Sequence, residues 1–291
     1  MSANPVPLET AVSPWAARRR RGEALRARHP FAAEVLTLYL ALLPVQEDAW
    51  NAVRGSPPST EEVARWAAAR LLPAVVESTV AAGPTALGES ARSRLANGAA
   101  EETLAGWLAG AELDPVDRYL ARASLGPVLE ALGEEAGAAC AQWPDGEPGA
   151  ACPLCGGPPQ LSWLASSGEE LVSGPRSLSC GRCCRSWSFS RSICPACGED
   201  GEEQLSVYTE QLEGPVSGNG NANGRGEGDA QPVFPHLRIA SCSTCNHYLI
   251  EVDMARDAHA VPEVDELAAL PLDLYAADQG LTKVTPNLMG F

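Results

Sequence analysis

Hydrophobic positions follow two different periods along the chain, and the change from one to the other divides the sequence. From about residue 15 to 141, apolar residues recur every three or four positions, which predicts amphipathic helices. Ser59 to Glu62 carries a helix-start signal, because a serine followed three residues later by a glutamate can satisfy the free amides of a first turn. Further starts are expected at Glu101-Glu102 and at Asp114-Pro115, where acidic residues or proline suit the first turn. The first half is therefore predicted to be a helical bundle.

Beyond about residue 150 the helical period stops, and short alternating segments replace it. Alternation of apolar and polar residues is typical of strands with one buried face. The expected strand segments are Gln160–Leu164, Leu178–Phe189, Leu205–Glu210 and His236–Val252. Leucine and alanine return at helical spacing from about Val264 to Asp278, so a short helix is expected near the C-terminus.

Turn-rich and polar stretches mark the expected domain boundaries. Residues 143–149 are rich in proline and glycine, and residues 218–228 are too polar and glycine-rich to order themselves. The predicted division is, in chain order, a disordered tail (1–14), a helical domain (15–141), a linker (142–150), a first module (151–192), a second module (193–255) with a disordered insertion (214–231), and a C-terminal helix and tail (256–291).

The formal net charge of the 291-residue chain is −16, and most of the excess lies in its second part. Residues 142–291 hold 8 basic and 20 acidic residues, and Lys283 is the only lysine of the chain. Because nucleic-acid binding depends on lysine and arginine contacts with phosphates, no nucleic-acid partner is expected.

The sequence predicts neither a membrane-spanning segment nor an export signal. No run of 18 apolar residues exists, so no spanning helix is expected. The run Arg18–Arg21 resembles a twin-arginine signal, but the apolar stretch Phe31–Val45 contains Glu34, and no small-residue cleavage site follows it. The run is instead interpreted as part of an arginine-rich amphipathic first helix, and the protein is expected to be cytoplasmic.

Eight of the ten cysteines form four pairs with the same spacing. The pairs are Cys152 and Cys155, Cys180 and Cys183, Cys194 and Cys197, and Cys242 and Cys245. Two intervening residues let both sulfurs face one metal ion about 2.3 Å away. Gly156 and Gly198 follow two of the pairs and permit the positive φ that such a turn often needs. In a reducing compartment this spacing indicates metal sites rather than structural disulfides.

Two pairs must combine to complete a tetrahedron, and the simplest combination follows chain order. Site one then holds Cys152, Cys155, Cys180 and Cys183, and site two holds Cys194, Cys197, Cys242 and Cys245. An interleaved combination is the alternative. Each site would join two knuckles through a β-hairpin or a short sheet, as in rubredoxin or a zinc ribbon, and four sulfur ligands suit zinc and iron alike. The predicted fold class is α+β: an N-terminal helical bundle, two rubredoxin-like or zinc-ribbon four-cysteine metal modules and a short C-terminal helix.

The remaining cysteines and the histidines receive no catalytic role. Cys184 is expected to be a half-buried spare thiol, and Cys140 a core residue at a helix end. A thioredoxin-like dithiol is not favoured, because no βαβ context surrounds any pair. The four histidines form no ligand-spaced or nucleophile–base set. His247 is expected to be an exposed strand residue, and the alternative is a supporting contact beside the metal site that holds Cys245. Because both sites are expected to be closed by four sulfurs, no enzyme is predicted.

With these motifs the sequence resembles the FdhE family, the formate dehydrogenase accessory proteins, over about residues 15–291. The motifs that carry the resemblance are Cys152–Pro159, Leu178–Trp187, Cys194–Gly198 and Ser241–Leu249, together with Val261-Pro262 and Asp265–Ala268 in the C-terminal segment. Two features depart from the family pattern. The insertion at 218–228 is unusually long and polar, and Asn287–Phe291 lacks a proline–phenylalanine ending.

The resemblance implies an accessory protein that assists the maturation of respiratory formate dehydrogenase. It implies binding to the catalytic subunit in the cytoplasm before export, and metal-ligand roles for the eight paired cysteines. The implied cofactors are two four-cysteine-bound metal ions, iron by resemblance, with zinc as the alternative. Two other functions stay open: a rubredoxin-like redox protein that acts on the client's active site, and a zinc-ribbon protein that binds nucleic acid. The oligomeric state and the contact surface also stay open.

Overall fold

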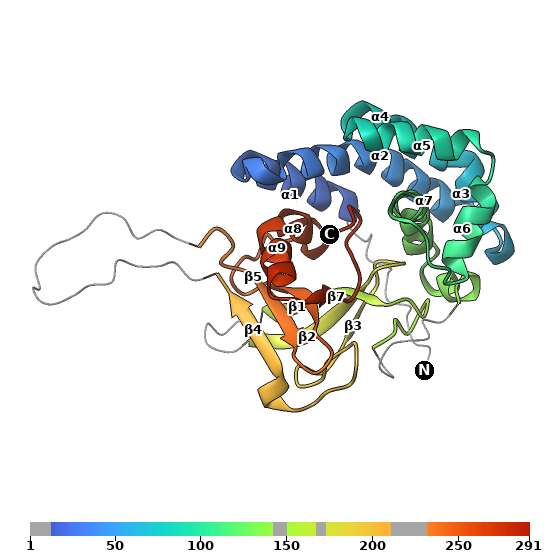
Figure 1. The fold of residues 1–291 in the computed structure, drawn as a ribbon. Coiled ribbons are helices and arrows are strands. Elements are labelled where there is room, and N and C mark those ends of the chain that lie inside the picture. Colours follow the sequence, from blue (N-terminus) through green and yellow to red (C-terminus); the bar gives the residue numbers. More distant parts are fainter. Residues whose placement is uncertain (1–12, 142–149, 167–172, 211–231) are drawn as a thin grey trace, which may run out of the picture.

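The computed structural model describes residues 13–141, 150–166, 173–210 and 232–291 (Figure 1). The predicted disordered tail and linker lie almost entirely outside the described residues, and the predicted disordered insertion lies entirely outside them.

The first half is helical, as the 3.6-residue period predicts. Its elements are α1 (Pro14–Arg28), a 3₁₀ turn (Pro30–Ala32), α2 (Ala33–Gly55), a 3₁₀ turn (Thr60–Glu62), α3 (Val63–Arg70), α4 (Leu72–Ala82), α5 (Thr85–Ala96), α6 (Ala100–Leu108), α7 (Pro115–Leu132) and a 3₁₀ segment (Gly133–Ala139). Within the described ranges, no helix has both the length and the apolar character that crossing a bilayer requires.

Two of the predicted helix starts show how local sequence sets these boundaries. Asp114 caps α7, since its Oδ1 accepts hydrogen bonds from the backbone amides of Val116 (3.0 Å) and Asp117 (3.1 Å), and a proline follows at the first helical position. The signal at Ser59 begins a 3₁₀ turn that leads into α3. There the Ser59 hydroxyl donates to Glu62 Oε2 (2.7 Å) and does not cap the backbone.

The second half forms one mixed sheet of seven strands (Figure 1). The strands are β1 (Pro159–Ser166), β2 (Ser173–Cys180), β3 (Ser186–Ser188), β4 (Leu205–Thr209), β5 (Leu237–Cys242), β6 (His247–Asp253) and β7 (Thr282–Lys283), and a 3₁₀ turn (Glu202–Gln204) precedes β4. Their order is β3-β2-β1-β6-β5-β4, with β7 also paired to β6. The pairs β1–β6 and β6–β7 are parallel, and the other pairs are antiparallel.

The sheet consists of two halves with the same series of features. Each half starts at a CxxC knuckle, continues through a β-hairpin whose second strand ends on a cysteine, turns at a second knuckle and adds a third strand. Strands β1 to β3 form the first half, and β4 to β6 form the second. The parallel pair β1–β6 joins them, with Leu161 opposite Ile250 and Trp163 opposite Val252. Two modules are predicted from the sequence, but their fusion into one sheet is not.

Two short helices stand where the sequence predicts one. They are α8 (Pro262–Ala268) and α9 (Leu270–Asp278), with Ala269 between them. Pro271 has no amide hydrogen with which to continue the hydrogen bonds of α8, so α8 ends and a new helix begins at Leu270, with the proline in its first turn. Both helices lie against the sheet, α8 on β1 and β6 and α9 on β5 and β6, and α1 packs beside α8 (Figure 1).

Two hydrophobic clusters hold these layers together, and they do not follow the boundary between bundle and sheet. The first cluster fills the bundle and includes the four cysteines of the first half-sheet. The second joins α1 and the beginning of α2 to β5, β6, α8 and α9, with Trp15, Leu25 and Leu36 packed against residues such as Ile250 and Leu267. Helix α1 therefore packs as part of the sheet layer as well as of the bundle.

Two arginines of the first helix are buried at this junction. Arg18 forms ion pairs with Glu130 of α7 (2.9 Å) and Glu263 of α8 (2.7 Å), and Arg21 pairs with Asp265 of α8. The arginine-rich helix predicted from the sequence is present, but these two charges point inward. Because a buried guanidinium needs carboxylate partners, they tie α1 to α7 and α8.

The only lysine of the chain is also buried. Lys283 Nζ lies 2.8 Å from Glu266 Oε1 and 3.1 Å from Asp273 Oδ1, so it joins β7 to both C-terminal helices. Burial raises the pKa of Glu266 above its usual value, while the positive charge of Lys283 acts in the opposite direction. The lysine is thus the cation that offsets part of the cost of burying this carboxyl group.

Replacing Lys283 with methionine is expected to destabilise the fold strongly, because two carboxylates lose their cation. Breaking a buried pair costs about 3–5 kcal/mol, and the free energy of unfolding at pH 7 should fall by this order in urea denaturation followed by tryptophan fluorescence. The matched control is Arg65→Met, which removes an exposed pair with Glu101 (3.3 Å) and should cost about 1 kcal/mol or less. Equal and small losses in the two variants would contradict the role given to Lys283.

Candidate metal centres

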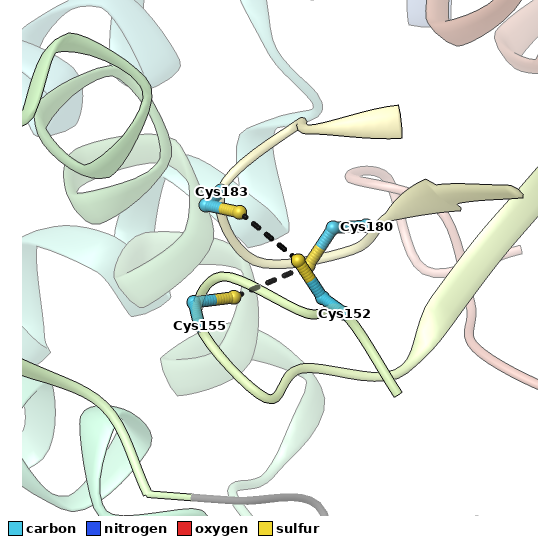
Figure 2. A group of neighbouring side chains, drawn as sticks. All are labelled: Cys152, Cys155, Cys180 and Cys183. Atoms are coloured by element: carbon cyan, nitrogen blue, oxygen red, sulfur yellow. Dashed lines mark hydrogen bonds between the residues drawn. The ribbon is translucent and has the colours of Figure 1, made fainter. Parts of the chain in front are cut away.

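The eight paired cysteines lie in two groups of four, one in each half of the sheet. Site one consists of Cys152, Cys155, Cys180 and Cys183, and site two consists of Cys194, Cys197, Cys242 and Cys245. Within each group the four Sγ atoms all lie within 4.8 Å of one another. Figure 2 shows site one, where the sulfurs of two knuckles converge. The structure thus has the combination that follows chain order, and the interleaved alternative is wrong.

The sulfur–sulfur distances fit a tetrahedral metal ion. In site one, Cys152 Sγ lies 3.7 Å from Cys183 Sγ, and Cys155 Sγ lies 3.4 Å from Cys180 Sγ (Figure 2). The two equivalent distances in site two are both 3.8 Å. Metal–sulfur bonds of about 2.3 Å give a tetrahedron with edges of about 3.8 Å, whereas a disulfide bond is about 2.05 Å long. The donor sets therefore fit a thiophilic ion such as zinc or iron, and the cysteines are free thiols.

The first knuckle of each site has the same backbone hydrogen bonds. The amide of Cys152 donates to the carbonyl of Gly157 (2.8 Å), and the amide of Gly156 donates to the carbonyl of Cys152 (2.9 Å). In site two the amides of Cys194 and Gly198 donate in equivalent bonds of the same lengths. Gly156 and Gly198 have φ values of +64° and +77°, so both glycines stand where the turn needs a residue without a Cβ.

In the second knuckle of each site, the residue that directly follows the last cysteine is not a glycine. Cys184 follows Cys183 with a φ of +60°, and Asn246 follows Cys245 with a φ of +55°. Asparagine tolerates this conformation better than cysteine does, so the strain is concentrated at Cys184. Cys184 as a residue is exposed rather than half-buried, but burial of its sulfur raises the pKa of the thiol to about 12, and the thiol does not belong to the group of four sulfurs.

Backbone amides and burial act in opposite directions on the thiols. The amide of Arg182 donates to Cys180 Sγ (3.3 Å), and the amide of Ala196 donates to Cys194 Sγ (3.4 Å), which favours the thiolate form. Burial raises the pKa of the Cys180 thiol well above its usual value and that of Cys194 to about 11. Because a metal ligand must be a thiolate, metal binding at these sites has to release protons.

The two sites differ in exposure. The four cysteines of site one are all buried within the bundle's hydrophobic cluster. In site two Cys197 is exposed and Cys245 is half-buried. Site one is therefore part of the core, whereas site two has one side open to solvent.

Two residues, Arg182 and Cys140, lie beside site one, and the sequence did not predict this position for either of them. Arg182 is buried between two cysteines of a knuckle, and its Nη1 donates to the carbonyl of Ala141 (2.6 Å) at the end of the bundle. Cys140, expected to be a core residue, is half-buried, and a hydrogen bond with Cys155 together with burial raises the pKa of its thiol. A basic residue inside a knuckle could have drawn attention to Arg182. No local pattern indicates Cys140, because only the packing of the 3₁₀ segment on the knuckle brings it to the site.

The histidines form no catalytic set in the described part of the chain. His236 is buried, and its Nε2 lies 2.7 Å from Asp265 Oδ1, so it belongs to the ion-pair network of α1. His247 is half-buried rather than exposed, and its Nδ1 lies 2.9 Å from the carbonyl oxygen of Cys245. Apart from the two cysteine groups, the residues with a described position contain no cluster of three or more such side chains suited to a metal ion.

Comparisons with known proteins point to one family. Residues 226–289 match the family model described as FdhE, C-terminal domain. The chain is 29% identical over 140 residues to a protein FdhE homolog of Aquifex aeolicus, and 32% identical over 139 residues to a protein FdhE homolog of Pseudomonas aeruginosa. These stretches cover 48% and 47% of this chain but only 41% and 38% of the two relatives. The sequence match thus spans less than half the length of these relatives.

The similarity of fold extends much further than the sequence match. The crystal structure of the FdhE protein from Pseudomonas aeruginosa has a TM-score of 0.63 to this chain at 24% sequence identity, and the match covers 94% of each chain. The mixed α+β architecture is therefore common to both proteins. The sequence matches and the shared fold confirm the resemblance to the FdhE family, and residues 226–289 correspond to the C-terminal domain of that family.

Proposed function

We propose that this protein is a non-catalytic accessory factor for the maturation of formate dehydrogenase. In this proposal it binds the catalytic subunit in the cytoplasm, before that subunit is exported. The observation that carries the proposal is the pair of four-sulfur groups within an FdhE-like fold. Each group offers four protein ligands, which leaves no open coordination position of the kind that a hydrolytic metal site uses. The function then lies in the surfaces that the fold presents.

The eight paired cysteines are proposed as the ligands of two metal ions. The sulfur–sulfur distances support zinc or iron equally. When bound, the ions supply folding energy, because the ligands converge only in the folded chain. The strands around each site are short, so apolar burial alone gives little stability to the knuckles.

Site one is proposed to couple the folding of the sheet to that of the bundle. Its four cysteines lie in the bundle's own hydrophobic cluster. Gly137, in the 3₁₀ segment that ends the bundle, has no room for a side chain because the backbone carbonyl of Leu154 lies against it. A knuckle that rearranges after losing its ion would therefore disturb the end of the bundle as well.

A rubredoxin-like redox role is a second candidate, and the exposure of site two favours it. Electron exchange with another protein needs an ion near the surface, and Cys197 is exposed. Iron at site two would supply one-electron chemistry, whereas zinc has no redox chemistry. A reversible change in visible absorbance on reduction would support this candidate, and a colourless protein filled with zinc would exclude it.

Substitution of one ligand in each site is expected to have unequal effects. The purified protein should contain two metal ions per chain, one for each four-cysteine group, and Cys155→Ser and Cys197→Ser should each lose one in elemental analysis. Because site one lies in the core, Cys155→Ser should lower the free energy of unfolding by about 4 kcal/mol or more. Cys197→Ser should lower the free energy of unfolding clearly less, since Cys197 lies at the solvent-exposed site two. Urea unfolding followed by circular dichroism measures both losses.

The control for these variants is Cys184→Ser, which changes an exposed cysteine outside both groups and should keep both ions. A well-folded wild-type protein with far fewer than two ions would contradict the proposed ligand roles.

Deleting the gene is expected to lower formate dehydrogenase activity in its host, provided that the strain has no second copy. The wild-type gene and Cys184→Ser should restore the activity, whereas Cys155→Ser should not, because loss of site one disturbs the fold. Formate-dependent dye reduction in cell extracts measures the activity. Wild-type activity in the deletion strain would count against the accessory function.

A further inference from the structure

Exposed apolar side chains gather at one groove of the molecule. Large apolar side chains with high exposure in the described residues include five that line a single groove of about 630 Å³: Phe31, Val207, Tyr208, Val233 and Tyr275. Their exposed fractions run from 38% for Tyr208 to 56% for Val207. Apolar patches of this kind on a soluble protein mark contact sites for other proteins or ligands.

The groove is lined by residues of the strands β4 and β5, of the helix α9 and of the 3₁₀ turn before α2, and by residues 233–234 ahead of β5. The rings of Tyr208 and Tyr275 lie 6.0 Å apart across it, and those of Phe31 and Phe234 lie 5.9 Å apart. The groove thus contains two of the chain's 4 phenylalanines and two of its 5 tyrosines. In a chain with few aromatic residues, this concentration is a structural feature of the groove and not a general property of the surface.

One wall of the groove is a sheet edge that no further strand covers among the described residues. β4 is the last strand of the sheet, and in the described part of the chain it pairs only with β5 (Figure 1). The backbone groups on its other side pair with no strand of the described residues, and such an edge can accept a further strand. Residues Leu205–Thr209 include neither a charged residue nor a proline, which are the usual means of protecting an edge.

Charge indicates what kind of segment fits this edge. Among the described residues that line the groove, Glu210 alone is charged. Its carboxylate accepts a hydrogen bond from the backbone amide of Phe234 (3.0 Å), and within the described ranges it forms no ion pair. Two copies of the chain would each carry a net charge of −16, so their general repulsion opposes self-association. A segment with arginine or lysine is attracted instead.

We infer that the groove binds an extended apolar segment of a partner protein that carries arginine or lysine near Glu210. The segment adds to β4 as a further strand, so that backbone hydrogen bonds run along the edge and alternate side chains enter the groove. This inference rests on the proposed function, in which the partner is the catalytic subunit of formate dehydrogenase, and it assigns a contact surface to that function.

The first test uses the full-length, metal-loaded protein and a labelled ten-residue peptide of alternating valine and threonine with two arginines at one end. Fluorescence anisotropy should show saturable binding. The same peptide with two central prolines should bind about tenfold more weakly or worse, because proline cannot donate to a strand edge. A peptide with glutamates in place of the arginines should also bind more weakly, because Glu210 repels it.

Three substitutions assign the binding to the groove. Val207→Asp should weaken binding about tenfold or more, which corresponds to about 1.4 kcal/mol. Leu274→Asp is the matched control, since Leu274 is 64% exposed on α9 but does not line the groove, and it should bind as the wild type does. Glu210→Gln keeps an acceptor for the Phe234 amide and should remove most of the preference for arginine over glutamate peptides. Circular dichroism and metal content establish that each variant is folded.

Several results would overturn the inference. Equal binding by the wild type and Val207→Asp would place the peptide elsewhere, and equal binding of the arginine and glutamate peptides would remove the charge argument. A dimer that Val207→Asp dissociates would show that a second copy occupies the groove. Binding that appears only after residues 214–228 are replaced by a short Gly-Ser linker would show that the chain's own segment is the occupant.

The same variants separate this inference from the proposed function. If the purified catalytic subunit of the host's formate dehydrogenase binds the wild type, Val207→Asp and Leu274→Asp equally, the accessory function stands and the groove is not its contact surface. If Val207→Asp alone loses binding, the groove is the contact surface. If the subunit does not bind the wild type at all, the proposed function itself fails.

Discussion

Parallel pairing between β1 and β6 turns two small cysteine-rich hairpins into one sheet that is broad enough to carry a layer of helices. A three-stranded module by itself buries little apolar surface, and its strands are short. Once the halves are joined, β5 and β6 present a continuous apolar face to α1, α8 and α9. The same pairing fixes the two four-cysteine sites relative to each other, because each site is attached to the ends of its own hairpin.

Buried charges then determine how the bundle sits on this sheet. An apolar contact tolerates small rotations, but a buried guanidinium is stable only where carboxylates meet it. Arg18 and Arg21 of α1 find their partners on α7 and α8, and Lys283 of β7 finds its partners on α8 and α9. These contacts connect the first helix of the chain with its last strand.

Features that depend on neighbouring residues could be predicted from the sequence, and features that depend on distant ones could not. The helical period, the strand segments and the CxxC spacing are local, and so is the chain-order combination, since each site lies within one hairpin unit. The parallel pair β1–β6 joins strands that are far apart in sequence, and no local residue pattern predicts this pairing. The inward orientation of Arg18 and Arg21 was missed for the same reason, because their partners lie more than a hundred residues away. Cys140 approaches site one only through the packing of two segments.

The burial of Lys283 has a consequence for the surface of the whole chain. Since this is the only lysine in the sequence, the described surface has no lysine amine, and its positive charge is carried by guanidinium groups. Guanidinium groups stay charged at any physiological pH, and they are not acetylated or joined to ubiquitin as lysines are. Lysine-directed cross-linking reagents will therefore find no target on the described surface, and a contact with a partner has to be trapped through carboxylates.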